Sequence, residues 1–403
     1  MQQGQALARC VAAPETFGDA WGRRPLFATA AELPRAFDDL LDLDAVDELL
    51  SRRGLRTPFL RMAKDGTVVD SSRFTRPGGA GAAIGDQVDD TAVMRLFADG
   101  TTIVLQALHR LWPPIVDFAG ALTDELGHPA QVNAYVTPPS SRGFSAHYDI
   151  HDVFVLQVAG EKRWIVQEPV HESPLRTQPW TQHRESVARA VAETEPTLDV
   201  VLRPGDALYL PRGYLHAAEA LGDVSAHLTV GIHVVTRQAL VEALLAEAED
   251  EAELRRSLPL GVDLSAPDAL ADDLSATIDA LVARLREVSA EAVATRVGAS
   301  LASASRPSPI GPLAQVGAAG QVDVHTRIRL RPGLRAQLDV ADGSTVVRVP
   351  GGSLEIDDGV AGSVAVLLQG GTRTVGSLPG ETEPVIELVR RLLLRGIVVP
   401  DVG

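Results

Sequence analysis

The stretch Ser145-Ala146-His147-Tyr148-Asp149, read together with the segment PGDALYLPRGYLH that ends at His216, decides how we interpret this protein. His147 and Asp149 form an H-x-D pair. On a β-strand, residues i and i+2 point to the same face, so this imidazole and this carboxylate would lie side by side. The later segment has a turn, a short apolar run and a second turn before His216. We therefore expect a strand over 144–149 and a later strand or turn that brings His216 beside it.

Two histidines and one carboxylate are the ligands of the facial triad in non-haem Fe(II) oxygenases, where open coordination positions accept other molecules. The sequence therefore predicts that His147, Asp149 and His216 bind Fe(II). An H-x-D tripeptide alone is common by chance, so the prediction depends on the turn–strand–turn block before His216. His151 would share the face of Asp149, but the triad is complete without it, and we do not expect it to be a ligand.

Several segments resemble the JmjC ribosomal oxygenases, which are Fe(II)- and 2-oxoglutarate-dependent protein hydroxylases of the cupin superfamily. The segments are NAYVTPP from Asn133, GFSAHYD from Gly143, DVFVLQVAGEKRW from Asp152, the block through Tyr214–Glu219, and the region from Phe17 to Phe27. The resemblance is good over residues 12–235, and beyond them only the layout is similar. As a joint pattern it is specific, whereas no single tripeptide in it is.

The resemblance implies an α+β fold with a double-stranded β-helix (cupin/JmjC) barrel and flanking helices. A helical dimerisation region and a small C-terminal winged-helix-like domain would follow. We place the catalytic domain at 1–236, the helical region at 237–301 and the last domain at 313–403. The helical region carries more apolar residues than a surface connector needs, which favours a homodimer. The alternative is that these helices simply pack on the barrel.

The resemblance also implies a site for the cosubstrate 2-oxoglutarate next to the metal. Lys162, fifteen residues after His147, would pair with the distal carboxylate, helped by the Tyr135 hydroxyl. Asn133 shares a strand face with Tyr135, and Thr229 lies on a later strand of the barrel, so both would line the pocket. O2 would take the last coordination position. The alternative is that Lys162 is a surface residue of the GEKR turn and that Asn133 and Tyr135 are buried, hydrogen-bonded core residues.

Other residues give weaker signals for this pocket. His227 shares a strand face with Thr229, and we expect both to point into the barrel. Gly231 stands on the same face where the resemblance led us to expect another hydroxyl residue. If Lys162 is not the cation, Arg163 and Arg142 are the next candidates.

The function implied by the resemblance is hydroxylation of a protein side chain, with His or Arg of a basic ribosomal protein as the expected target. Two alternatives stay open. One is a hydroxylase of a free amino acid or small peptide in a biosynthetic pathway, and the other is a metal-binding cupin without turnover.

Composition sets broad limits on the class of protein. A sequence of 403 residues with 45% hydrophobic residues is expected to form two or three globular domains. We find neither an apolar run long enough for a membrane span nor the pattern of a secretory signal. Cys10 is the single cysteine, which fits a cytoplasmic protein. The formal charge of −16 argues against general affinity for nucleic acids. The last domain lacks a basic helix, so we expect protein contact rather than DNA binding.

Periodicity gives the expected elements. We expect helices over 35–52, 90–98 and 103–126, with the Pro113-Pro114 pair interrupting or kinking the last one. Barrel strands are expected near 131–136, 152–158, 162–167, 198–202, 207–210 and 225–235, with a long insert at 168–197 that has the length of a functional lid. Residues 238–300 should be helical and 302–312 a linker. In the last domain we expect strands at 322–330, 344–349 and 362–368 and a helix at 384–394.

Overall fold

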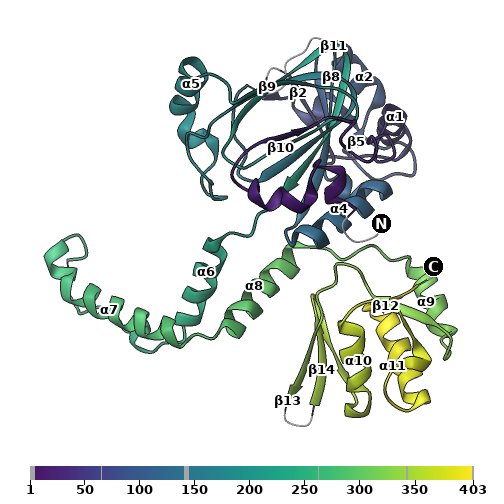
Figure 1. The fold of residues 1–403 in the computed structure, drawn as a ribbon, viewed down its shortest axis with the longest axis vertical. Helices are drawn as coiled ribbons and strands as arrows, with labels where there is room; N and C mark the ends of the chain where they lie inside the picture. Colours follow the sequence, from purple (N-terminus) through teal and green to yellow (C-terminus); the bar gives the residue numbers. More distant parts are fainter. Residues whose placement is uncertain (1–4, 65, 140–144, 262, 342–343, 402–403) are drawn as a thin grey trace. The chain divides into compact units, whose positions relative to one another are not determined.

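The computed structural model describes residues 5–64, 66–139, 145–261, 263–341 and 344–401. The protein folds into two compact units, Met1–Val234 and Val235–Gly403 (Figure 1). The first unit contains the large β-sheet and the predicted site.

Among the described residues of the first unit, nine strands form one antiparallel sheet. They are β1 (Leu26–Ala28), β2 (Leu60–Lys64), β3 (Thr67–Val68), β6 (Thr102–Leu105), β7 (Ala130–Thr137), β8 (Asp152–Gln167), β9 (Leu198–Leu202), β10 (Ala207–Leu210) and β11 (Leu215–Ile232). Along the sheet the order is β1-β10-β8-β11-β7-β6-β2-β3, and β9 pairs with β8. A short separate hairpin is formed by β4 (Thr75–Arg76) and β5 (Gln87–Val88).

The long strands β8 and β11 each bend in the middle, and each therefore has two arms. The first arm of β8, 152–159, pairs with the second arm of β11, 226–232, and the second arm of β8, 161–167, pairs with the first arm of β11, 215–221. The register shifts between Leu221 and Ala226. Gly160 lies at the bend of β8 with a φ of +62°, and a Cβ there would collide with the carbonyl oxygen of Val224. Only glycine fits this backbone conformation and this close approach without strain. The bend replaces the break that we expected between separate strands 152–158 and 162–167.

In the described part of the first unit, six helices share an apolar core with this sheet, namely η1 (Leu7–Arg9), η2 (Pro14–Asp19), α1 (Leu43–Arg52), α2 (Asp90–Ala98), α3 (Leu108–Leu111) and α4 (Pro113–Leu126). The short helix η3 (Ser71–Arg73) has no buried residues. The predicted helix 35–52 is shorter than expected, because Asp42 caps its start by accepting a hydrogen bond from the Ala45 amide.

The predicted helix over 103–126 is wrong in its first part. Residues 102–105 form β6, because the run Thr-Ile-Val-Leu is β-branched and buried and pairs with β2 and β7. The interruption that we expected at Pro113-Pro114 is confirmed, because α3 ends at Leu111 and Pro113 and Pro114 begin α4, where the missing amide donor and the fixed φ of proline cost little.

The predicted strand over 144–149 is also wrong in the described part. Residues 145–149 form no strand, and an isolated antiparallel bridge joins His147 to His216. Phe144 lies outside the described residues. The insert 168–197 contains η4 (Trp180–His183) and α5 (Arg184–Glu193).

The second unit begins with the helices α6 (Arg237–Ala248), η5 (Glu253–Arg255), α7 (Pro267–Glu287) and α8 (Ala290–Ala304). Several apolar residues on α6 and α7 are exposed, namely Leu240, Val241, Leu245, Leu274, Ile278 and Val282. The positions 274, 278 and 282 are four residues apart, so these residues form one stripe on α7.

The rest of the second unit has a separate apolar core. Its elements are α9 (Pro312–Gly320), β12 (Arg327–Leu330), β13 (Gln337–Ala341), β14 (Ser344–Val349), β15 (Gly352–Ile356), η6 (Asp358–Val360), α10 (Ala361–Leu368), β16 (Arg373–Thr374), η7 (Val375–Ser377), α11 (Thr382–Leu394) and β17 (Val398–Pro400). The expected strand at 362–368 is wrong. This segment is helix α10, which buries Val364 and Leu367 three residues apart. In the described part of the protein, no helix is both long and apolar enough to cross a membrane.

Candidate metal centre

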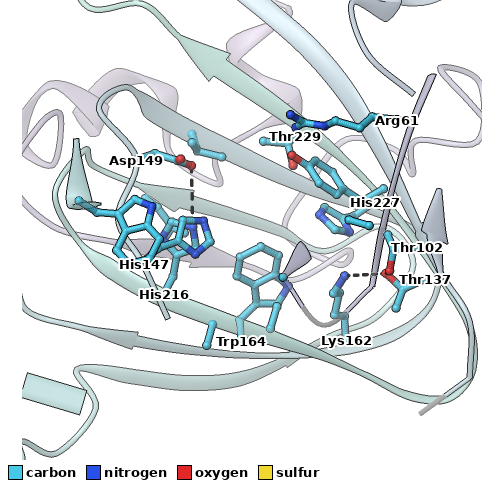
Figure 2. Close-up of a pocket in the computed structure, with 18 residues that line it drawn as sticks. Arg61, Thr102, Thr137, His147, Asp149, Lys162, Trp164, His216, His227 and Thr229 are labelled. Carbon is cyan, nitrogen blue, oxygen red and sulfur yellow. Dashed lines mark hydrogen bonds and ion pairs between the residues drawn. The ribbon is translucent and has the colours of Figure 1, made fainter. Parts of the chain in front are cut away.

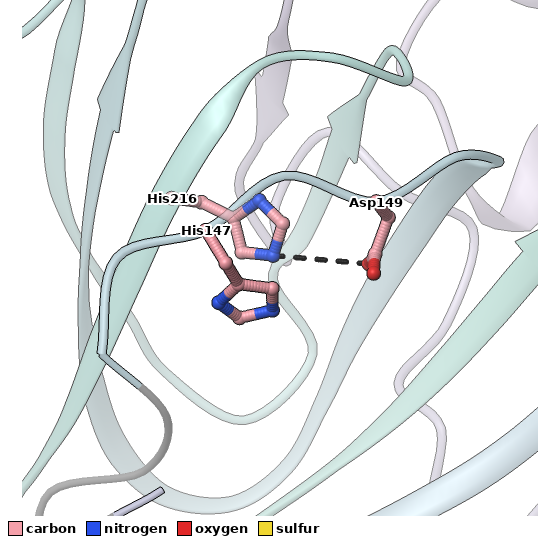
Figure 3. Close-up of side chains that lie close together, drawn as sticks. All are labelled: His147, Asp149 and His216. Atoms are coloured by element: carbon pink, nitrogen blue, oxygen red, sulfur yellow. Dashed lines mark ion pairs between the residues drawn. The ribbon is translucent and has the colours of Figure 1, made fainter. Parts of the chain in front are cut away.

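The three predicted ligands lie together in the first unit. The candidate ligand atoms of His147, Asp149 and His216 all lie within 4.8 Å of one another (Figure 3). Nε2 of His216 is 3.8 Å from Oδ2 of Asp149, and the ring centroids of the two histidines are 4.5 Å apart. These separations are compatible with three ligands on one side of a single ion.

Backbone hydrogen bonds hold the three residues in place. The His147 amide donates to the His216 carbonyl at 3.2 Å, and the His216 amide donates back to the His147 carbonyl at 2.8 Å. The amide of Gly213, in the turn before His216, donates to the carbonyl of Asp149 at 3.0 Å. The turn that we identified from Pro211 and Gly213 therefore binds the H-x-D segment directly, and an isolated bridge replaces the expected strand.

The tautomer of both histidines follows from their local contacts. Nδ1 of His147 is 2.8 Å from the carbonyl oxygen of Ser145, and Nδ1 of His216 is 3.1 Å from that of Tyr214. A carbonyl oxygen only accepts, so each Nδ1 carries the proton and each Nε2 keeps its lone pair. A metal-binding histidine commonly donates its other ring proton to a carbonyl in this way.

The local charges also favour the ligand forms. Burial, followed by the neighbouring His147, lowers the pKa of His216 to about 4, so this imidazole is neutral near pH 7. Burial by itself would raise the pKa of Asp149, but the nearby His151, His216 and His147 lower it below its usual value. A neutral imidazole and an ionised carboxylate are the states that bind a cation.

A cavity of about 280 Å³ opens beside the triad and is lined by residues from β2, β6, β7, β8, β10 and β11. Both arms of β8 and of β11 contribute, so the sheet curves around this cavity. The predicted residues Tyr135, Lys162 and Thr229 line it together with the triad (Figure 2). Other lining residues had no role in our sequence-based prediction, among them Arg61, Thr102, Thr137, Trp164 and Trp180.

Lys162 lies in the wall of the cavity with 3% of its surface exposed, so it is not a surface turn residue. Its Nζ donates to Oγ1 of Thr137 at 3.2 Å, and Oγ1 of Thr102 lies 3.5 Å from the same hydroxyl. Among the described residues no carboxylate pairs with this ammonium. Burial lowers the pKa of Lys162 to about 7. A buried cation with no carboxylate partner is costly unless a ligand supplies the anion.

His227 and Trp164 also line the cavity. The His227 ring stacks on Tyr135 with centroids 5.2 Å apart and meets Trp164 edge-on at 5.5 Å. Nδ1 of His227 and Nε1 of Trp164 are buried and have no hydrogen-bond partner in the described ranges. Burial, and then Lys162, lowers the pKa of His227 well below its usual value, so its ring is neutral. The alternation that placed His227 inside the barrel also applies to Trp164, two residues after Lys162.

The structure does not place Asn133 among the residues that line the cavity. Its Oδ1 accepts a hydrogen bond from the Ala107 amide at 3.0 Å. Ala107 has a φ of +56°, so this bond supports a strained turn before α3. Of the other candidate cations, Arg163 pairs with Asp199 at the surface, and Arg142 lies outside the described residues.

The insert 168–197 packs against the segment that carries the metal ligands. Tyr148, between two of the ligands, is buried with Val187 of α5, and its hydroxyl donates to the carbonyl of Gln178 at 2.9 Å. Trp180 lines the cavity, with its ring centroid 6.2 Å from that of His147. The insert therefore contacts the site on two sides.

Gly231 lies directly against the side chain of His151. A Cβ on Gly231 would overlap the imidazole ring of His151, which stacks on His233 with centroids 5.6 Å apart. The space that we expected a hydroxyl group to fill is thus taken by His151. His151 is not among the described residues that cluster as ligands.

Comparison with known proteins agrees with this geometry. Residues 116–240 match the family model described as the JmjC domain. The protein therefore contains a region that is similar to the JmjC domain. The JmjC region lies within the first unit except for its last residues, and it includes all three candidate ligands.

The protein is similar to several curated relatives over part of its length. Ribosomal oxygenase 1 of Rattus norvegicus is 35% identical over 178 residues, which are 42% of this protein and 29% of the rat protein. The protein called bifunctional lysine-specific demethylase and histidyl-hydroxylase NO66 of Drosophila persimilis is 40% identical over 140 residues, which are 32% of this protein and 19% of that one. The match spans less than a third of the length of either relative.

Solved structures extend the likeness beyond the JmjC region. The structure of E. coli ycfD has a TM-score of 0.54 at 17% identity, covering 96% of this protein and 98% of that one. A structure of YcfD, a ribosomal oxygenase from Escherichia coli, in complex with cobalt and 2-oxoglutarate has a TM-score of 0.52 at 16% identity, with the same coverage. At this identity the likeness establishes a common fold.

Proposed function

We propose that this protein is an Fe(II)- and 2-oxoglutarate-dependent oxygenase that hydroxylates an amino-acid residue of another protein. The expected target is His or Arg of a ribosomal protein, in keeping with the names of its relatives. The observation that carries the proposal is that two features share one cavity. One is a cluster of two histidines with one carboxylate, and the other is a buried lysine that has no carboxylate partner among the described residues.

The donor set fits iron. His147, Asp149 and His216 would hold Fe(II) on one side and leave the cavity side open. Bound iron, together with 2-oxoglutarate and O2, supplies the oxidising chemistry that places a hydroxyl group on a C–H bond. The backbone carbonyls that accept from Nδ1 of His147 and His216 leave both Nε2 atoms free to bind the ion. The neighbouring histidines keep Asp149 ionised.

The cavity also fits a dicarboxylate. Lys162 would bind the distal carboxylate, and the Thr137 hydroxyl beside it offers a further hydrogen bond. Burial raises the pKa of Tyr135 to about 12, so its hydroxyl remains a donor. Nε1 of Trp164 and Nδ1 of His227, both without a partner in the described ranges, lie in the same wall and offer polar contacts to a ligand. Thr229 belongs to the same lining.

The direct test measures succinate formation from 2-oxoglutarate by the Fe(II)-loaded protein under air, with metal-free protein as the control. Mass spectrometry then compares ribosomal proteins from a strain that lacks the gene with those from its parent. We expect succinate formation and one or more peptides that lose a +16 Da shift in the deletion strain. Metal binding without any succinate would favour the cupin without turnover. Succinate without a shifted protein would favour a small-molecule substrate.

The second unit has a proposed role in assembly. We propose that region 237–301 forms a homodimer through the exposed stripe on α7 and the exposed residues of α6, because such stripes usually mark interfaces. We propose that the domain 313–403, which we expect to be winged-helix-like, contacts protein rather than DNA. A ribosomal substrate would also place the enzyme in the cytoplasm.

A further inference from the structure

Arg61 is a second cation in the cavity that the proposed chemistry does not use. It comes from β2 and lines the cavity with Tyr135 and Thr229. Its Nε is buried without a hydrogen-bond partner, and no ion pair or hydrogen bond of its guanidinium occurs within the described residues. A buried polar group without a partner in the free protein is expected to find one in the working complex.

The register of the sheet places Arg61 along the length of the cavity. Arg61 is directly opposite Val104, Val104 opposite Tyr135, and Tyr135 opposite His227. Residues directly opposite one another in an antiparallel sheet point to the same face, so Arg61 belongs to the row of the Tyr135 and His227 rings. The next row holds Thr102 and Thr137, where Lys162 binds. Arg61 is therefore one row away from the Lys162 end.

The two cations differ in position and exposure. Figure 2 shows the guanidinium of Arg61 beside Thr229, whereas Lys162 lies beside Thr137. Arg61 is only half-buried, whereas Lys162 is almost fully buried. Arg61 is thus the more accessible of the two cations.

The proposed cosubstrate has two carboxylates, and both already have places. One belongs at the metal and the other at Lys162. The acceptor for Arg61 must then come from the other molecule in the reaction. A guanidinium presents several donors in a rigid fork, which suits oxygen atoms of a carboxyl-derived group. A residue that brings one of its C–H bonds to the triad also brings its own backbone carboxyl group within a few bonds of it.

We propose that Arg61 is a substrate-binding residue that donates hydrogen bonds to the backbone carboxyl oxygen of the residue that is hydroxylated. This oxygen is a peptide carbonyl in a protein substrate and a carboxylate in a free amino acid. The inference rests on the proposed oxygenase function and adds a specificity contact to it.

The test separates substrate binding from cosubstrate binding. The variants are Arg61→Met and Arg61→Lys, with Lys162→Met as the cosubstrate reference and Arg163→Met as the matched surface-arginine control. One measurement is the Kd of 2-oxoglutarate for the Co(II)-loaded full-length protein without O2, which also reports whether each variant folds and binds metal. The other is the fraction of target peptide that carries +16 Da in the deletion strain complemented with each variant.

We expect Arg61→Met to bind 2-oxoglutarate like the wild type and to lower the modified fraction, as the kcat/KM for the target falls by about 10- to 100-fold through the loss of a charged hydrogen bond. Arg61→Lys should retain part of the modification, and Arg163→Met all of it. A 2-oxoglutarate affinity that falls in Arg61→Met as far as in Lys162→Met would overturn the inference. Full modification by Arg61→Met would overturn it as well.

A third measurement tests whether the substrate is a free amino acid instead of a protein. If the wild type modifies no protein, succinate formation is measured with each of the common free amino acids. Stimulation of the wild type that disappears in Arg61→Met supports the inference with a free carboxylate as the acceptor. Equal stimulation of both proteins, or none of the wild type, overturns it. If the wild type modifies no protein, the proposed protein target is refuted. If Arg61→Met modifies the target as fully as the wild type, only the role of Arg61 is refuted.

Discussion

Lys162 and Arg61 reach the same cavity from different strands, and neither cation has a carboxylate partner among the described residues. Asp149 is the one carboxylate among the described residues that line this cavity, and it belongs to the cluster of candidate metal ligands. The cavity is therefore prepared for anionic or strongly hydrogen-bond-accepting molecules. This property makes several predictions testable.

The first prediction concerns the ligands. His147→Ala and Asp149→Ala should each abolish 2-oxoglutarate turnover, because two remaining ligands do not hold the ion in the cavity. His151→Ala should keep the metal stoichiometry, since the His151 ring stacks on His233 outside the cluster. Metal content and succinate formation are measured on the same samples. Full turnover in both ligand variants would refute the metal assignment.

The second prediction concerns the cosubstrate. Lys162→Met should weaken 2-oxoglutarate binding and raise its KM strongly, while metal binding remains. Removing one side of a desolvated charge pair typically costs about 3–5 kcal/mol. Lys64→Met is the matched control, because Lys64 pairs with Asp99 at the surface. An unchanged KM in Lys162→Met would mean that another group binds the distal carboxylate.

The third prediction concerns the pH dependence of stability. The pKa of Lys162 is about 7 in the folded protein and has its ordinary value of 10.5 after unfolding. Between these values the unfolded protein binds more protons than the folded one, so the free energy of unfolding rises with pH. The contribution is at most about 1.4 kcal/mol per pH unit. Denaturant titrations of the metal-free protein between about pH 7 and pH 9.5 should show this rise, and Lys162→Met should lack it. Parallel pH profiles of the two proteins would contradict the prediction.

The fourth prediction concerns assembly. Ile278→Glu, in the α7 stripe, should shift a full-length dimer to monomer in light scattering, because it buries a charge at the interface. Val191→Glu is the control, since Val191 of α5 is similarly exposed. A wild type that is monomeric at micromolar concentration would refute the dimer.

The fifth prediction concerns the last domain. Its separate apolar core indicates that the fragment 313–403 folds alone. We expect no tight duplex DNA binding by this fragment in a titration at low salt, because the fragment has no excess of basic residues and lacks a basic helix. Binding that weakens steeply with added salt would contradict the protein-contact role.

The proximity of His147, Asp149 and His216 could be predicted because it depends largely on short-range features of the sequence. His147 and Asp149 are only two residues apart, and the turn before His216 is visible as Pro211 and Gly213. The alternation of strand residues, which put Asn133 on the same face as Tyr135, did not predict the place of Asn133 correctly. Alternation gives the face of a strand but not how far along the strand that face borders the cavity. The Asn133 amide group supports the Ala107 turn instead.

Arg61 could not be found from sequence, because its role depends on β2 lying two strands away from β7 in the sheet. The short apolar segments were the least predictable. The run of β6 and the run of α10 are both too short for periodicity to separate strand from helix. Pairing with β2 and β7 decided the first, and burial of Val364 and Leu367 decided the second.

Tyr148 joins the chemistry to the surface. Its neighbours His147 and Asp149 face the cavity, while its own ring is held by Val187 and its hydroxyl by the carbonyl of Gln178. The ligand-bearing segment is thus clamped from behind by the insert 168–197. The insert therefore restrains the position of the peptide that links His147 to Asp149.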